Sequence, residues 1–82
     1  MISIEKIPMN AVGEYLVHTK NTTYYVISRG NDDVELHFTH KGKERQLKGK
    51  LKMPIAVGYR MMVDSPDGPL TSAVASIQMR ES

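Results

Sequence analysis

The chain has 82 residues, a formal net charge of +2 and no cysteine. A chain of this length forms one domain with a small core, and without cysteine that core has neither a disulfide framework nor a thiolate metal site to stabilise it. No apolar run approaches the roughly 18 residues of a membrane span, and the N-terminus lacks a signal-peptide pattern. We therefore expect a single soluble, cytoplasmic domain over residues 1–82, with no membrane partner.

Alternation of apolar and polar residues with a period of two runs through most of the chain. It predicts β-strands over residues 14–20, 23–28, 33–39, 45–53, 59–63 and 70–79. Residues 1–12 are expected to form a short strand or an irregular lead-in, since Pro8 interrupts any helix there. The predicted fold class is all-β: a small single-domain meander of five to six strands, closed as a strongly bent sheet or as an SH3-like or OB-like barrel.

Residues 33–39 show the cleanest alternation, with Val34, Leu36 and Phe38 on one face and polar residues on the other. Phe38 is the chain's one phenylalanine. We therefore expect Phe38 to be a main residue of the core, and Glu35 to point outward with the other polar side chains.

The segment DSPDGP at residues 64–69 is typical of a tight turn. Pro66 has the φ value that the second position of a turn requires, and Gly68 tolerates positive φ. We expect this turn to join the strands of residues 59–63 and 70–79 as a β-hairpin.

A basic segment over residues 40–52 is the leading functional candidate. Its one acid is Glu44, and its six cations are Lys41, Lys43, Arg45, Lys48, Lys50 and Lys52. In a strand, Lys48, Lys50 and Lys52 project from one face about 6.6 Å apart, which suits contacts to a phosphate backbone. The same row also keeps an exposed strand from pairing with a neighbour, or binds an acidic protein surface.

Tyr24 and Tyr25 are adjacent in a predicted strand and therefore face opposite sides of the sheet. We assign Tyr25 to the nucleic-acid site, where its ring would stack on a base, and Tyr24 to a protein interface. Met61 and Met62 are adjacent as well, so at least one of them faces outward in a regular strand. Both are interface candidates for a homo-oligomer, and the alternative use of these flexible side chains is to fill an irregular core.

No catalytic, metal or cofactor site is predicted. His18, His37 and His40 lack a carboxylate that would complete a ligand set, and His37 and His40 face opposite sides of a strand. The serines stand in no nucleophile motif, and residues 42–49 lack the spacing of a phosphate-binding loop. We therefore expect no enzyme activity.

Three stretches carry a resemblance to other proteins: VHTKNTTYYV, VGYRMMV and LTSAVASI. The first matches a T-x-N-(S/T)-x-Y pattern at Thr19, Asn21, Thr22 and Tyr24. The last matches a T-S-x-V-x-x-I pattern at Thr71, Ser72, Val74 and Ile77. Together they resemble short β proteins of bacteria and their phages, although Ala73 stands where that pattern often has proline. The resemblance implies a prokaryotic or phage source and brings no activity with it.

The function expected from these residues is a non-catalytic binding module, a small β-barrel that holds nucleic acid through its basic strand. The alternative is an inhibitor or accessory module encoded by a phage or a bacterium, which binds a protein or a small charged ligand as a homo-oligomer.

Overall fold

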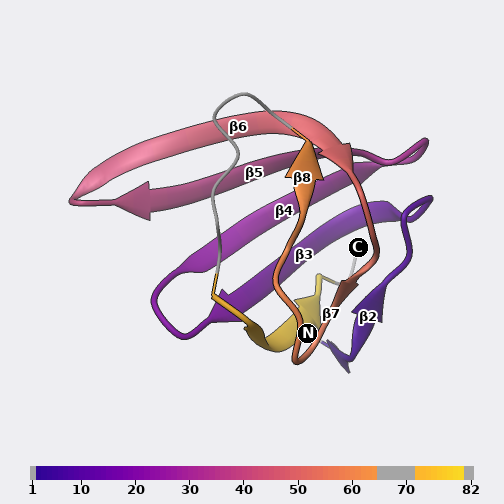
Figure 1. The fold of residues 1–82 in the computed structure, drawn as a ribbon, viewed down its shortest axis with the longest axis horizontal. Helices are drawn as coiled ribbons and strands as arrows, with labels where there is room; N and C mark the ends of the chain where they lie inside the picture. Colours follow the sequence, from indigo (N-terminus) through magenta and orange to yellow (C-terminus); the bar gives the residue numbers. More distant parts are fainter. Residues whose placement is uncertain (1, 65–71, 81–82) are drawn as a thin grey trace.

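The computed structural model describes residues 2–64 and 72–80, and over these residues the protein is all-β (Figure 1). Seven antiparallel strands form one sheet in the order β1-β9-β3-β4-β5-β6-β8, and β2 pairs with β7 in a second, small sheet. The strands are β1 Ile2–Ile4, β2 Lys6–Ile7, β3 Val12–Thr19, β4 Thr23–Arg29, β5 Asp33–His40, β6 Lys43–Leu51, β7 Ile55–Ala56, β8 Val63–Asp64 and β9 Val74–Met79. The predicted all-β class is confirmed, and β3 to β6 form the expected meander.

Tight turns set the register of the meander. The turn between β4 and β5 has positive φ values at Gly30 (86°), Asn31 (52°) and Asp32 (66°), and the turn between β5 and β6 has them at Lys41 (53°) and Gly42 (77°). Turns with two positive φ values match the right-handed twist of the strands they join. The β5–β6 turn is of this kind, and its ladder begins directly at the turn with His40 opposite Lys43, whereas the β4–β5 ladder begins farther from its turn, at Ser28 opposite Val34.

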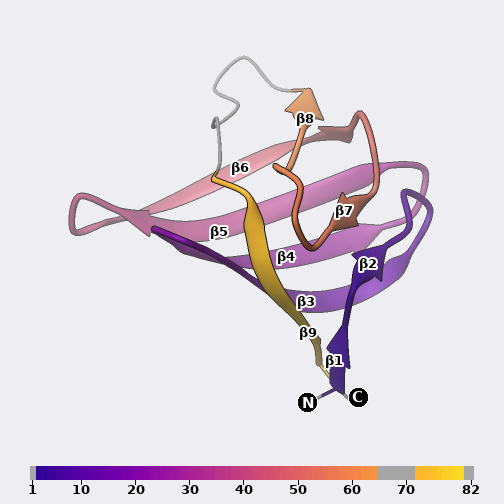
Figure 2. The ribbon, with the colours of Figure 1, turned by 60° about the horizontal axis from the view of Figure 1, so that its bottom comes forward.

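The core lies on the concave, inner face of the bent sheet, where β2, β7 and the chain beside them cross over it (Figure 2). Ile7 of β2 pairs with Ile55 of β7, and both side chains are fully buried. β1 and β8 stand at the two ends of the strand order and do not pair with each other. Over the described residues the sheet is therefore open and strongly bent, rather than closed as a barrel.

The first and last strands lie side by side. β1 pairs with β9, with Ile2 opposite Met79, and β9 also pairs with β3. The β3–β9 ladder shifts register between His18 and Thr19, just before the β3–β4 turn. There the Asn21 amide donates a 2.9 Å hydrogen bond to Ser72 Oγ, which links the turn to the start of the C-terminal segment.

The hairpin expected between residues 59–63 and 70–79 is wrong. β8 pairs with β6 and β9 pairs with β3 and β1, and among the described residues the two segments share one isolated bridge, between Arg60 and Ala73. The physical reason is burial: the chain from β7 to β8 crosses the inner face and buries Met61, which is 3% exposed. Residues 65–69 of the expected turn lie outside the described residues.

Phe38 is less central than its sequence position predicts. Val34 and Leu36 are buried, whereas Phe38 is half-buried and packs its ring against Tyr24, with 5.0 Å between ring centroids. The reason is that the β4–β5 ladder pairs residues only as far as His37, so Phe38 lies at the rim of the core.

Leu36→Ala should therefore destabilise the protein more than Phe38→Ala. Removing the fully buried Leu36 side chain leaves a cavity and should cost about 2–5 kcal/mol, whereas the half-buried Phe38 should cost about 1–2 kcal/mol. Urea unfolding of both variants measures the difference. A larger loss for Phe38→Ala would contradict this description of the core.

Candidate nucleic-acid interface

The six cations of the basic segment do not form one row. Lys48 and Lys50 lie on the outer face, which is the face of β3 to β6 that points away from the core. Lys43 and Arg45 have the opposite parity along β6, Lys41 lies in the turn before it, and Lys52 follows its last residue. The predicted alternation is confirmed for β6, but the segment is divided between two faces and a turn.

Lys48 and Lys50 are compensated by acids across the β5–β6 ladder. Lys50 lies opposite Asp33, with 3.1 Å between Lys50 Nζ and Asp33 Oδ1, and it also donates to the carbonyl oxygen of Asn31. Lys48 lies opposite Glu35, and its charge lowers the pKa of that carboxyl. Pairing of this kind leaves less positive charge for a ligand than the sequence suggests.

The tip of the β5–β6 hairpin is different. The β4–β5 ladder ends at the pair Tyr25–His37, while the β5–β6 ladder continues to His40–Lys43. Residues 38–45 therefore project as a two-stranded extension, named here the basic arm (Figure 1). The side chains of Lys41, Lys43 and Arg45 are exposed on it, and none forms a hydrogen bond or an ion pair within residues 2–64 and 72–80.

A shallow depression of about 440 Å³ adjoins the arm. It is lined by three threonines, three rings, one leucine, one acid and one cation: Leu16, Thr22, Thr23, Tyr25, His37, Phe38, Thr39, Glu44 and Arg45. The rings of Tyr25 and His37 have centroids 6.2 Å apart. The structure thus brings together Tyr25 and Arg45, which the sequence assigned to one site, and adds His37 and the threonines.

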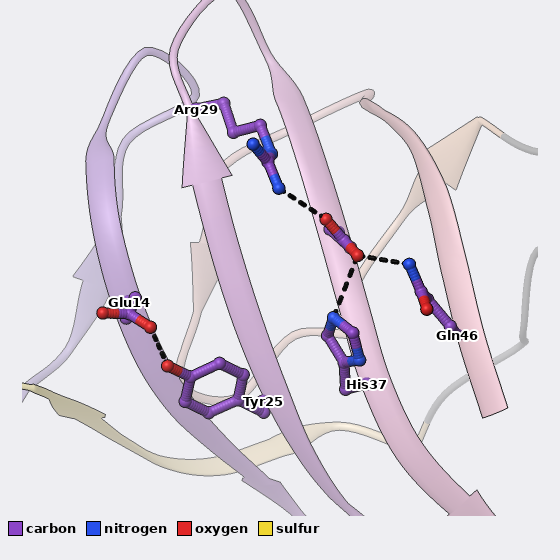
Figure 3. Close-up of polar contacts among 6 residues, drawn as sticks. Glu14, Tyr25, Arg29, His37 and Gln46 are labelled. Carbon is purple, nitrogen blue, oxygen red and sulfur yellow. Dashed lines mark hydrogen bonds and ion pairs between the residues drawn. The ribbon is translucent and has the colours of Figure 1, made fainter. Parts of the chain in front are cut away.

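Polar contacts hold the Tyr25 ring in place. Its hydroxyl donates to a carboxylate oxygen of Glu14 on the neighbouring strand (Figure 3). Arg80 donates to the Tyr25 hydroxyl at 3.1 Å, and its guanidinium lies 3.6 Å from Glu14 Oε1. Because the hydroxyl is engaged at the far end, the ring is fixed across the outer face.

Glu35 is the centre of a second network on the same face. It points outward as predicted, yet it is only 6% exposed because neighbouring side chains cover it. Arg29 Nη2 donates to one carboxylate oxygen at 2.7 Å, while Gln46 donates to the other, which lies 3.0 Å from His37 Nε2 (Figure 3). The Arg29 hydrogen bond and the nearby positive charges outweigh burial and lower the pKa of Glu35.

The three residues that the sequence assigned to a protein interface differ in burial. Tyr24 is 6% exposed and Met61 is 3% exposed, so both are core residues in this chain and present little surface to a partner. Burial also raises the pKa of the Tyr24 hydroxyl, against a smaller effect of its hydrogen bond with Thr22. Met62 is 46% exposed, so it is the one of the three that lies at the surface, where an interface residue must lie.

The three histidines lie apart from any ligand set. His18 Nδ1 lies 3.1 Å from Thr23 Oγ1, His37 contacts Glu35, and His40 is exposed on the arm. No group of three or more metal-ligating side chains occurs among the residues that the structure describes. The same residues include no helix of the length and apolar character that crossing a bilayer requires.

Comparison with protein-family models, with curated proteins and with solved structures gave no match to this chain. The resemblance to short bacterial and phage proteins therefore stays a prediction. The candidate interface rests on the residues of this chain alone.

Glu35 generates a pH prediction. A carboxyl whose pKa is lower in the folded state than its ordinary 4.5 stabilises the fold above that pH, and this contribution is lost as the pH falls through the folded value. Glu35→Gln should lower the free energy of unfolding at neutral pH, and its difference from wild type should shrink below about pH 4.5. Urea unfolding at pH values from about 7 down to about 3 measures this.

Glu5→Gln is the matched control, because the exposed Glu5 side chain has no hydrogen bond or ion pair within residues 2–64 and 72–80. Its unfolding free energy should follow wild type at every pH. A Glu35→Gln difference that is the same at neutral and acid pH would contradict the assigned role of the carboxylate.

Proposed function

We propose that this protein is a non-catalytic module that binds single-stranded nucleic acid. The basic arm contacts phosphates, and the adjoining depression accepts an unpaired base. The observation that supports this proposal best is the depression that Arg45 lines together with the rings of Tyr25 and His37, next to an arm that carries two further exposed cations, Lys41 and Lys43.

The arm suits phosphate contacts. Lys43 and Arg45 project from one face of β6, about 6.6–6.8 Å apart, and Lys41 adds a third cation at the turn. The exposed guanidinium of Arg45 is able to bind a phosphate through two parallel hydrogen bonds. Lys48 and Lys50, which are opposed by Glu35 and Asp33, are assigned a smaller share of the binding.

The depression suits a base. Stacking of a base on an aromatic side chain contributes about 1–3 kcal/mol and tolerates any sequence. The ring of Tyr25 is already oriented by Glu14 and Arg80, so little rotamer entropy remains to be lost when a base binds. The hydroxyls of Thr23 and Thr39 at the same depression are able to hydrogen-bond with base edges.

A protein partner is the second candidate, with the chain acting as an inhibitor or accessory module of phage or bacterial origin. It is favoured by apolar side chains around the β7–β8 connection: Val57, Tyr59 and Met62 are 38%, 61% and 46% exposed. Exposed apolar side chains are frequent at protein contact sites.

Salt dependence tests the phosphate contacts. Replacing Lys41, Lys43 and Arg45 together by Gln should reduce the slope of log affinity against log salt by about two units, because each single-strand phosphate contact contributes about 0.7. The melting temperature should hardly change, since exposed cations contribute little to stability. Titration of a labelled oligonucleotide at several salt concentrations measures the slope.

The control replaces Lys48, Lys50 and Lys52 by Gln, which changes the net charge by the same amount. Because Lys48 and Lys50 have acids opposite them, this variant should lose less than about one unit of slope. Equal losses in the two variants would show a diffuse charge effect and contradict the arm as the site. No binding by wild type at low salt would remove the nucleic-acid proposal.

Tyr25 tests the stacking contact. Tyr25→Ala should weaken binding by about 1–3 kcal/mol without changing the salt slope, because a stacked ring displaces no counterions. Tyr25→Phe keeps the ring but loses the contacts to Glu14 and Arg80 that orient it, and should weaken binding less than Tyr25→Ala does. Binding by Tyr25→Ala that equals wild type would show that the ring does not contact a base.

A further inference from the structure

Along one edge, residues 43–49 of β6 have no strand partner among residues 2–64 and 72–80. Along its other edge β6 pairs with β5 at every residue from Lys43 to Lys50, but β8 covers only Lys50 and Leu51. Residues 43–49 therefore have a strand partner on one side only within the described chain. An open edge of this length presents backbone groups that pair readily with another strand.

The direction of the backbone groups on this edge follows from the last bonds of β6. The Leu51 N–H donates to Asp32 O at 2.8 Å, on the β5 side, and the Lys52 N–H donates to Met62 O at 2.9 Å, on the opposite side. Because successive residues of a strand alternate in direction, the N–H and C=O groups of Glu44, Gln46 and Lys48 point to the open edge.

This edge is complementary to itself. When two copies pair antiparallel with Gln46 opposite Gln46, Glu44 of each copy lies opposite Lys48 of the other. The three residue pairs that face the edge then exchange backbone hydrogen bonds, and both acid–lysine pairs are attractive. Glu44 is the one acid of the basic segment, and in this register the Glu44 side chain of each copy faces a lysine.

The neighbouring registers are worse. Pairing centred on Arg45 sets the two Arg45 side chains against each other, and pairing centred on Lys48 does the same to the two lysines. Pairing centred on Leu47 requires the edge at Lys50, which Asp64 of β8 already occupies. The open residues 43–49 are centred on Gln46, so only this register uses the whole edge without repulsion.

We propose that two copies of this chain associate through the open edges of β6, in the register that places Gln46 opposite Gln46, and form one continuous sheet. Repulsion between lysines disfavours pairing in the other registers, while the attraction between Glu44 and Lys48 favours the register centred on Gln46. This association uses different groups from the earlier homo-oligomer expectation, since Met61 is buried, and it does not depend on nucleic-acid binding.

A charge-reversal pair tests the register. Glu44→Lys sets lysine against Lys48 of the second copy, and Lys48→Glu sets two acids together, so each variant alone should associate at least about tenfold more weakly than wild type. A mixture of the two variants restores both attractive pairs and should associate as wild type does. Sedimentation velocity over a concentration series, without nucleic acid, measures all three.

Two controls accompany this test. Lys20→Glu makes the same charge change at an exposed lysine away from the edge, and it should associate as wild type does. Because Lys48 lies opposite Glu35, the Lys48→Glu chain is measured at a temperature where its melting curve shows it folded. A monomeric wild type at high micromolar concentration would overturn the proposal, as would single variants that associate normally.

A covalent test is independent of charge. The chain has no cysteine, so Gln46→Cys introduces one thiol, and residues that face each other in a hydrogen-bonded pair have Cα atoms about 5.5 Å apart, within disulfide reach. Mild oxidation should give a disulfide-linked dimer in high yield. Lys48→Cys should give little, because its two copies would be about 14 Å apart, and equal yields would overturn the register.

Discussion

The ladder between β5 and β6 is the interaction on which the rest of the structure depends. Its register places Leu36 opposite Leu47 on the inner face and Glu35 opposite Lys48 on the outer face. A slip by one residue would turn Leu47 outward and lysines into the core, because side chains alternate with a period of two. The turn at Lys41 and Gly42 prevents that slip, since both residues adopt the positive φ that this short turn requires. The arm and the contact of Gln46 with Glu35 are both consequences of this one register.

Much of the sheet could be predicted from the sequence. A period of two tells which residues share a face, so the inward positions of Val34, Leu36 and Leu47 followed from the pattern. The pattern carries no information about which strand lies alongside, however. The compensation of Lys50 by Asp33, and the network of Arg29 and Gln46 around Glu35, join residues of different strands and needed the register.

The hairpin that was expected and not found shows a second limit of prediction from the sequence. The alternation on either side of residues 64–69 favours a hairpin, but strand pairing follows the burial of apolar side chains, and here one of the two segments crosses the core. Met61 is buried by such a segment, and its partners come from distant parts of the chain. Phe38 was overestimated for a related reason: alternation indicates the face of a residue and not its distance from the end of the neighbouring strand. The residues of the resembling patterns are mostly architectural, since Tyr24, Val74 and Ile77 are buried and Asn21 bonds with Ser72.

The pairing of β1 with β9 has a practical side. Because Ile2 lies opposite Met79, the described ends leave the fold at one place, and the basic arm lies away from them (Figure 2). A domain whose two attachment points are adjacent can be inserted into a surface loop of a carrier protein without separating the ends of that loop. The entropic cost of lengthening such a loop grows only slowly with its length. The domain is therefore suited to insertion into a carrier protein through β1 and β9, with the arm left free.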